Sequence, residues 1–276
     1  MLIDAHQHIW RVAAPWHQWP QADLGAIHRD YDVEDLRQIR DSAGVSASVL
    51  VQSQPADEDT DWLLERAAQD PSILGVVGWA DLKAEDAVAR VTDLSRRPKL
   101  VGLRPMLQSL PSGWILDAAL DPVIGVLLTT GLRFDALVTP RQLPDLVAFV
   151  RRWPELAVVL DHSGKPALSG ESFEAWRAAM AILADNPAVF CKLSGLLTEG
   201  NPDQALEVDR IAETVFALFG SDRILWGSDW PVVTLRTGYA NWLKHSRRLC
   251  AMYAPGAEAE VFGRNANRFY GLNAKL

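Results

Sequence analysis

Histidine and aspartate side chains that could bind a metal ion or activate a water molecule gather in three short segments of this sequence. His6 and His8 are separated by one residue, so both side chains face the same side of an extended strand. Imidazole nitrogens bind metal ions and transfer protons near neutral pH. Asp229 follows the apolar run 223–226, within the sequence Gly-Ser-Asp-Trp-Pro at 227–231. The spacing allows His6 and His8 to converge on one ion or one water molecule; the alternative is that they are ordinary hydrogen-bonded histidines of the core or the surface.

The third segment follows an apolar run at 156–160 and carries three ionisable side chains. Asp161, His162 and Lys165 come directly after this run. Each segment alone is weak evidence for a site, because Asp and Ser also cap helices and form turns. Together the segments place three of the chain's six histidines at the ends of apolar runs. Lys165 is expected either to bind a substrate hydroxyl or carboxylate, or to form a salt bridge in its loop.

Other charged residues at the ends of apolar runs have both a functional and a structural interpretation. Arg104 is expected to contact an oxygen-rich substrate, because a guanidinium beside a buried strand needs an anionic or carbonyl partner. Asp135 is expected to contact the substrate or to form a turn at a strand end. Lys192 could point toward the substrate, but we expect it to pair with a buried acid such as Asp161 and so to serve the core. Asp4 is expected to share the face of His6 and orient its ring, or to be satisfied by backbone donors.

Eight short runs rich in Val, Ile and Leu alternate with amphipathic stretches that have helical periodicity. The apolar runs are 2–5, 46–51, 74–79, 100–103, 132–137, 156–160, 189–193 and 223–226. The amphipathic stretches include 33–43, 62–68, 84–94, 144–153, 173–183 and 205–219. Apolar strands that are buried on both faces predict a parallel sheet under helices. Eight such units favour a closed (β/α)8 barrel, a TIM barrel of the α/β class formed by a single domain of residues 1–276, over an open doubly wound sheet.

The carboxyl ends of the predicted strands are where catalytic groups of such a barrel lie, and aromatic side chains gather there too. The chain has 11 tryptophans. Those expected near this mouth are Trp10, Trp16, Trp19, Trp79, Trp114, Trp226 and Trp230. Aromatic rings stack on the apolar faces of sugars, so we expect several of them, Trp79 and Trp230 among them, to wall a pocket for a polyhydroxylated ring.

Composition and charge restrict the class of protein. The chain has 276 residues, of which 49% are hydrophobic and 22% charged, which is typical of a globular protein and not of a disordered or fibrous one. A formal net charge of -8 argues against nucleic acid as a partner. Because no apolar run approaches the ~20 residues needed to cross a bilayer, no membrane association is expected. Two distant cysteines, Cys191 and Cys250, suit a reducing compartment, so we expect a cytoplasmic protein, whereas the oligomeric state stays unknown.

Four motifs of this sequence resemble those of the amidohydrolase superfamily. They are His-x-His at 6–8, Leu-Asp-His with Gly-Lys-Pro at 160–166, Lys-Leu-Ser-Gly at 192–195 and Gly-Ser-Asp-Trp-Pro at 227–231. The sequence is most similar to the amidohydrolase-related branch of sugar-acid lactonases and pyrone dicarboxylate lactonases, with L-fuconolactonase-like proteins nearest. The similarity covers essentially the whole chain. It implies a (β/α)8 barrel that hydrolyses a small-molecule lactone.

The resemblance also implies a metal site, and this sequence departs from the family pattern there. Many amidohydrolases have a Lys or Glu ligand at the end of strand four and a His at the end of strand five, where this sequence has Arg104 and Asp135. A binuclear centre is therefore not expected. The ligands expected for one divalent metal, zinc, are His6, His8 and Asp229, with His162 as a further candidate. Members of this branch are known to work without a required metal, so the resemblance leaves open whether activity needs one.

The residues predict a mechanism for opening a lactone. We expect Asp229 to act as the general base that takes a proton from water and later returns it to the leaving oxygen. His6 and His8 would hold the metal or hydrogen-bond the water. His162, assisted by Arg104 or the metal, would polarise the substrate carbonyl. The alternatives are a zinc-dependent decarboxylase of the same superfamily and a non-catalytic barrel that binds a sugar.

Overall fold

Eight parallel strands form a ring at the centre of the molecule. The computed structural model of the protein describes residues 1–166, 171–198 and 205–274. The strands are β1 (Ile3–Gln7), β2 (Ala47–Val51), β3 (Ile73–Gly78), β4 (Leu100–Leu103), β5 (Arg133–Ala136), β6 (Val158–Leu160), β7 (Val189–Leu193) and β8 (Ile224–Trp226), and each pairs with the next along the chain. Hydrogen bonds from Asp229 N to His6 O (2.8 Å) and from His8 N to Trp230 O (2.7 Å) close the ring between β8 and β1. The predicted TIM barrel is confirmed.

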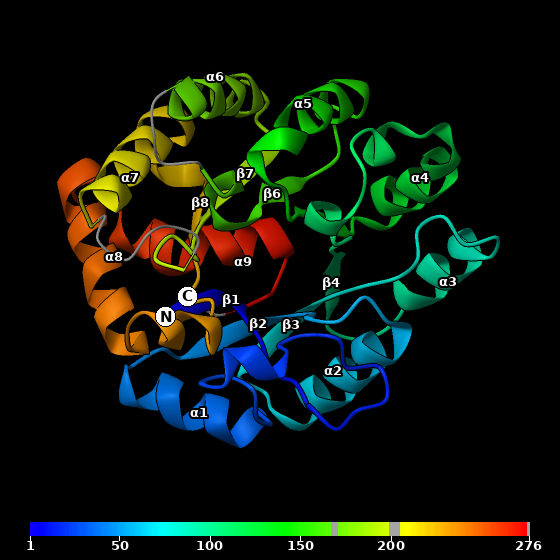
Figure 1. Ribbon diagram of the computed structural model, residues 1–276, viewed down its shortest axis with the longest axis horizontal. Helices are drawn as coiled ribbons and strands as arrows, with labels where there is room; N and C mark the ends of the chain where they lie inside the picture. The colour runs from blue at the N-terminus through cyan, green and yellow to red at the C-terminus, as the bar shows by residue number, and fades with distance from the viewer. Residues whose placement is uncertain (167–170, 199–204, 275–276) are drawn as a thin grey trace.

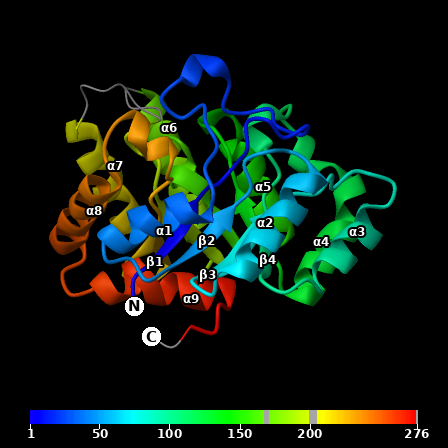
Figure 2. The same cartoon turned by 90° about the horizontal axis from the view of Figure 1, so that it is seen from below.

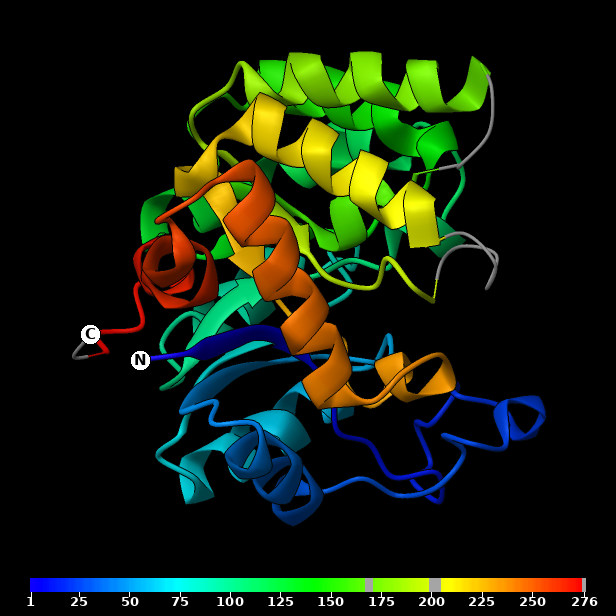
Figure 3. The same cartoon turned by 90° about the vertical axis from the view of Figure 1, so that its left-hand side faces the viewer.

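Helices surround this ring and cover one of its two ends (Figure 1). They are α1 (Val33–Ser42), α2 (Asp57–Gln69), α3 (Ala87–Leu94), α4 (Asp121–Thr130), α5 (Leu143–Arg152), α6 (Glu171–Ala184), α7 (Ala205–Phe219), α8 (Tyr239–Tyr253) and α9 (Asn265–Tyr270). Two further views place α9 across the end of the barrel at which β1 begins (Figure 2, Figure 3). The opposite end, where the strands finish, therefore remains available for a site.

Periodicity predicts most of these elements to within a few residues, but it gives no bounds for α4, α8 and α9. The sequence of α4, Asp-Pro-Val-Ile-Gly-Val-Leu-Leu-Thr-Thr, is apolar around most of its circumference. Such a segment shows no polar face, so a period of 3.6 residues cannot be recognised in it. The helix nevertheless ends as local chemistry requires, with Gly131 in the left-handed conformation at φ 74°.

A bulge in β1 decides which of its side chains face the interior of the barrel. The pairing of β1 with β2 shifts by one residue between Asp4 and Gln7. As a result Asp4 does not share the face of His6: its carboxylate accepts hydrogen bonds from Tyr239 Oη of α8 (2.9 Å) and from Ser228 N (2.9 Å). The alternative expectation, a buried carboxylate satisfied largely by backbone donors, is the one that the structure supports, and burial raises the pKa of Asp4 to about 6.

Apolar side chains pack in two layers, one inside the barrel and one between the barrel and its helices. Inside, Val49, Val77 and Val159 pack with Phe269 of α9. Both cysteines, Cys191 and Cys250, are unpaired and buried. Among the described residues, no helix is both long and apolar enough to cross a membrane.

The buried carboxyl of Asp59, in the first turn of α2, makes stability depend on pH. Burial raises its pKa to about 7, against the lowering effect of hydrogen bonds from Gln54 N and Ser53 N. In the unfolded chain the same group titrates near pH ~4, so its contribution to stability is complete below that pH and is lost as the pH rises through about 7.

We therefore expect the free energy of unfolding of the wild type to fall, relative to that of Asp59→Asn, between pH ~4 and pH ~7, by up to ~1.4 kcal/mol per pH unit. Urea denaturation at a series of pH values measures this difference. Because both proteins retain Asp4, its titration cancels in the comparison. A difference that does not change with pH over this range would contradict the assignment.

Candidate active site

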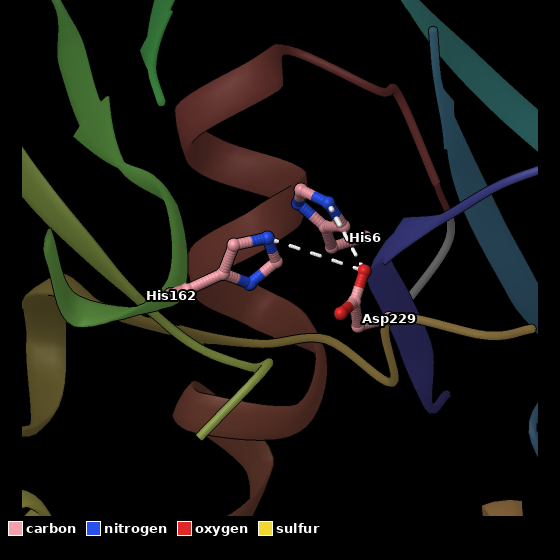
Figure 4. Close-up of side chains that lie close together, drawn as sticks. All are labelled: His6, His162 and Asp229. Atoms are coloured by element: carbon pink, nitrogen blue, oxygen red, sulfur yellow. Dashed lines mark ion pairs between the residues drawn. The ribbon is translucent and has the colours of Figure 1, made fainter. Parts of the chain in front are cut away.

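The three segments that carry the predicted chemistry meet at the carboxyl end of the barrel. The Asp229 carboxylate is their common point: its Oδ1 lies 3.3 Å from His8 Nε2, 3.7 Å from His6 Nε2 and 4.0 Å from His162 Nε2. All four side chains are at least nine-tenths buried. Figure 4 shows the rings of His6, on β1, and His162, in the turn after β6, directed toward Asp229. The structure thus brings together the four residues that the sequence predicts to be catalytic.

Unusual backbone conformations aim two of these side chains. Asp229 has φ 58° and His162 has φ 51°, both in the left-handed region that residues other than glycine seldom occupy. Residues held in this region cluster at functional sites, where surrounding contacts maintain them. For Asp229 those contacts include the hydrogen bond from its own N to His6 O. With this conformation the chain turns sharply after β8 while the Asp229 carboxylate points toward the histidines.

The donor atoms of this cluster fit a divalent metal ion. His8 Nδ1 lies 2.7 Å from Val51 O, and because a carbonyl only accepts, Nδ1 carries the proton of the neutral ring. His8 Nε2 therefore presents its lone pair to a carboxylate oxygen, which also only accepts, so a cation or a proton belongs between them. His6 Nε2 is buried and makes no hydrogen bond within the described part of the chain.

Ligand atoms of three residues in the cluster also lie close enough together to share one ion. His6, His162 and Asp229 each offer an atom within 4.8 Å of the other two. Imidazole nitrogen and carboxylate oxygen are the donors that zinc accepts. His162 thus joins the expected ligands His6, His8 and Asp229 as a residue that could hold the metal.

A buried ion-pair network lies beside the cluster and fixes His6 from the side away from Asp229. Lys192 Nζ lies 2.5 Å from Asp135 Oδ2, 2.9 Å from Asp161 Oδ1 and 3.1 Å from His6 Nδ1. Arg104 Nη1 donates to Asp161 Oδ2 at 3.1 Å. Lys192 therefore pairs with buried acids, as the structural interpretation of the sequence expects.

Asp135 belongs to this network and not to the wall of a cavity. Its side chain is completely buried, and its Oδ2 accepts from Tyr270 Oη of α9 at 2.6 Å as well as from Lys192. Because the side chain is completely buried, neither carboxylate oxygen of Asp135 is exposed to a ligand in a cavity. The structure therefore does not place Asp135 where a substrate contact was expected.

Electrostatics keep the acids of the site ionised and the central histidine neutral. Burial raises the pKa of Asp229, but the neighbouring His162, His8 and His6 lower it more, so the net pKa lies below its usual range. For Asp161, burial is likewise outweighed by Lys192 and His6, and its pKa is held well below the ordinary value. Burial and the charge of Lys192 lower the pKa of His6. At neutral pH the site therefore presents a carboxylate that can accept a proton.

A cavity of ≈ 720 Å³ opens above the cluster. Some of the predicted substrate-binding residues line this cavity, and others are buried in the protein behind it. His8, His162, Asp229, Arg104 and Lys165 line it, together with Trp19, Trp79 and Trp114. This volume is typical of pockets for small organic ligands. The cavity combines aromatic surfaces with polar groups that can bind a sugar-like molecule.

Trp230 is the predicted substrate contact that lies behind this cavity. Its ring is 4% exposed and packs edge-on against Tyr31 with ring centroids 5.1 Å apart. The peptide after Asp229 turns toward β1, where Trp230 O accepts from His8 N, and this turn directs the indole into the protein. The tryptophans near the mouth thus include rings that face the cavity, such as Trp79, and rings that pack behind it.

Sequence reasoning missed two buried polar residues that support the cavity, Gln54 and Thr60. Both are at most 1% exposed and neither lines the cavity. They hydrogen-bond the backbone of Trp19 and Trp79, respectively. In the sequence they look like ordinary polar residues after a strand and at a helix start, so no residue type or spacing singles them out.

Comparison with known proteins places this arrangement in a family. L-fucono-1,5-lactonase of Burkholderia ambifaria is 46% identical over 277 residues, which cover 98% of this chain and 96% of that protein. L-fucono-1,5-lactonase of Burkholderia multivorans is 35% identical over 284 residues, with the same coverage of 98% and 96%. A crystal structure of an amidohydrolase from Burkholderia multivorans with bound zinc superposes with a TM-score of 0.91 at 34% identity, covering 98% of this chain and 99% of that one. A family model described as Amidohydrolase matches residues 3–272, and the chain belongs to this family.

Proposed function

We propose that this protein is a hydrolase that opens the ring of a small sugar-acid lactone. The observation that carries the proposal is the buried carboxylate of Asp229, which faces three imidazoles at the floor of a cavity lined by tryptophan. Two relatives that match over nearly the whole chain are L-fucono-1,5-lactonases, which supports a sugar-acid lactone as the substrate. The buried, unpaired cysteines fit an enzyme of the cytoplasm.

Asp229 performs both proton transfers in the proposed reaction. Its carboxylate takes a proton from water as the water oxygen attacks the carbonyl carbon of the lactone. The carbonyl oxygen gains negative charge, which the imidazole of His162 and the guanidinium of Arg104 stabilise from the cavity lining. When the tetrahedral intermediate collapses, the bond between the carbonyl carbon and the ring oxygen breaks. Asp229 then returns its proton to that oxygen, so the product is the open hydroxy acid.

We further propose that zinc binds to this cluster. The residues that would hold it are His6, His8, His162 and Asp229. A bound zinc ion supplies Lewis-acid polarisation and lowers the pKa of water. Lys165 and Trp79 line the same cavity and are proposed to bind the substrate, Lys165 through its hydroxyls or carboxylate and Trp79 by stacking on the ring. Trp230 and Asp135 are left out of the substrate contacts because both are buried behind the cavity.

The close approach of His162 to Gly195 predicts what one methyl group added at Gly195 would do. Gly195 has φ +66°, and a Cβ built there would lie 2.6 Å from His162 Cγ and would overlap Nδ1. We therefore expect Gly195→Ala to move the His162 ring and to lower kcat/KM for lactone opening by about tenfold or more. The matched control is Gly220→Ala, which has φ +64° but nothing within 4 Å of the new Cβ, so it carries only the backbone strain. Equal kcat/KM values for the two variants would contradict a role for His162.

A pH-indicator assay with a panel of substrates tests the proposed function. The panel contains 1,4- and 1,5-lactones of sugar acids, a pyrone dicarboxylate and an aromatic carboxylate, and the zinc content of the protein is measured before and after chelation. We expect proton release from one or more sugar-acid lactones, and if zinc takes part in catalysis, activity will fall with chelation and return with zinc. Carbon dioxide release from the carboxylate would instead indicate a decarboxylase. Binding of a lactone without turnover would indicate a non-catalytic barrel.

A further inference from the structure

Two of the tryptophans that line the cavity come from different loops, yet hydrogen bonds connect both of them to one helix turn, Trp79 directly and Trp19 through Gln54. Trp19 lies in the loop after β1, and Trp79 directly follows β3. Between them in the barrel, the loop after β2 leads into the first turn of α2, which contains Asp59 and Thr60. Asp59 and Thr60 are 1% and 0% exposed, so this turn is held inside the protein.

Thr60 fixes Trp79 through a single hydroxyl. The last ladder hydrogen bond at the end of β3 runs from Arg104 N to Gly78 O (2.8 Å). At the next residue, Trp79 N donates to Thr60 Oγ1 (2.7 Å) and Thr60 Oγ1 donates to Trp79 O (2.8 Å). The hydroxyl thereby replaces the neighbouring strand as the partner of both backbone groups of Trp79.

Gln54 fixes Trp19 in the same way, through its amide. Gln54 Oε1 accepts from Gln18 N (2.7 Å) and Trp19 N (3.1 Å), and Gln54 Nε2 donates to Trp19 O (2.5 Å). The backbone of Gln54 is tied in turn to α2, because Asp59 Oδ2 accepts from Gln54 N at 3.2 Å. Both tryptophans are therefore connected to adjacent, buried residues of one turn.

We propose that the first turn of α2 is a frame that sets the relative positions of Trp19 and Trp79, with Thr60 and Gln54 as positioning residues for substrate binding. Neither Thr60 nor Gln54 lines the cavity, so each acts only through the tryptophan that it holds. The proposed catalytic residues His6, His8, His162 and Asp229 lie on other segments, within or after β1, after β6 and after β8. Loss of either hydrogen-bonding group should therefore raise KM and leave kcat nearly unchanged. This inference rests on the proposed function only for its kinetic consequence.

The comparison of Thr60→Val with Thr60→Ser separates positioning from packing. Valine keeps the shape of threonine and removes the hydroxyl, whereas serine keeps the hydroxyl and removes the methyl group, which packs against Gly78: a Cβ built there would lie 2.5 Å from it. We expect Thr60→Val to raise KM by about tenfold with kcat within about threefold, and Thr60→Ser to remain close to the wild type. Gln54→Ala should behave like Thr60→Val. The opposite order, with serine impaired and valine normal, would overturn the proposal in favour of packing.

Amide hydrogen exchange tests the frame without any enzymatic activity. We expect faster exchange at the Trp79 amide in Thr60→Val and at the Gln18 and Trp19 amides in Gln54→Ala, with normal protection in Thr60→Ser. Thr129→Val is the matched control, because Thr129 is exposed and its Oγ1 donates to the backbone of its own helix, α4, at Gly125 O and Val126 O.

The two readouts distinguish the failure of the frame from the failure of the proposed function. Unchanged exchange at Trp79 in Thr60→Val would overturn the frame whatever the activity. If the wild type opens no lactone but the Trp79 amide still exchanges faster in Thr60→Val than in the wild type, the proposed function fails and the frame stands.

Discussion

Replacement of Asp229 by asparagine should lower kcat for lactone opening by at least about a thousandfold while the protein stays folded. Asparagine has the size of aspartate but cannot take a proton from water or return one to the leaving oxygen. Its amide can still donate to His8 Nε2, the atom that lies 3.3 Å from Asp229 Oδ1, so the local packing should persist. Initial rates over a range of lactone concentrations measure kcat. Thermal unfolding shows whether the variant stays folded, and metal analysis measures its zinc content.

Asp81→Asn is the control for removal of a carboxylate from the cavity. Asp81 lines the same cavity but is exposed and is far in sequence from the histidine cluster. We expect its kcat to remain within about threefold of the wild type, because it takes no part in proton transfer. If Asp229→Asn retained kcat within about tenfold of the wild type, the assignment of Asp229 as the general base would be wrong.

Replacement of Lys192 by methionine should produce the largest loss of stability, about 3–5 kcal/mol in the free energy of unfolding. Methionine has a similar length but no charge, so Asp135 would lose the ammonium that lies 2.5 Å from it, and Asp161 would keep only Arg104 as a cationic partner. Burial of an unpaired carboxylate is strongly unfavourable, and either protonation or local unfolding must follow. Urea denaturation followed by circular dichroism measures the change.

Two further variants show whether the loss arises from unpaired charge. The double variant Asp135→Asn with Lys192→Met removes the carboxylate that Lys192→Met leaves without a cation, and it should recover part of the lost stability. Lys244→Met, on the exposed face of α8, should change stability by no more than about 0.5 kcal/mol. A loss below about 1 kcal/mol for Lys192→Met would show that the network contributes little to stability.

The barrel and the meeting of the three catalytic segments could be predicted because both follow from simple patterns. Apolar runs at regular intervals specify parallel strands, and parallel strands in a barrel bring their carboxyl ends together. His162 and Asp229 are therefore neighbours in the structure, although their positions in the sequence differ by 67. No further information about loops was needed for this part of the site.

The direction of individual side chains could not be predicted, because it depends on local departures from regular geometry. The bulge in β1 turns Asp4 toward α8, although strict alternation would place it beside His6. Asp135 follows the alternation, but it meets Lys192 and Tyr270, a residue of the last helix that no sequence pattern connects to it. Long-range partners of this kind are visible only in three dimensions.

Ring opening in ¹⁸O-labelled water shows whether water adds to a lactone carbonyl at the Asp229 site. Protein of known zinc content is incubated with L-fucono-1,5-lactone, and the product is followed by mass spectrometry against a buffer control. We expect the open acid to form much faster than in buffer and to carry one ¹⁸O atom in its carboxylate. No acceleration over buffer with any sugar-acid lactone, or label in the hydroxyl group and not in the carboxylate, would contradict it.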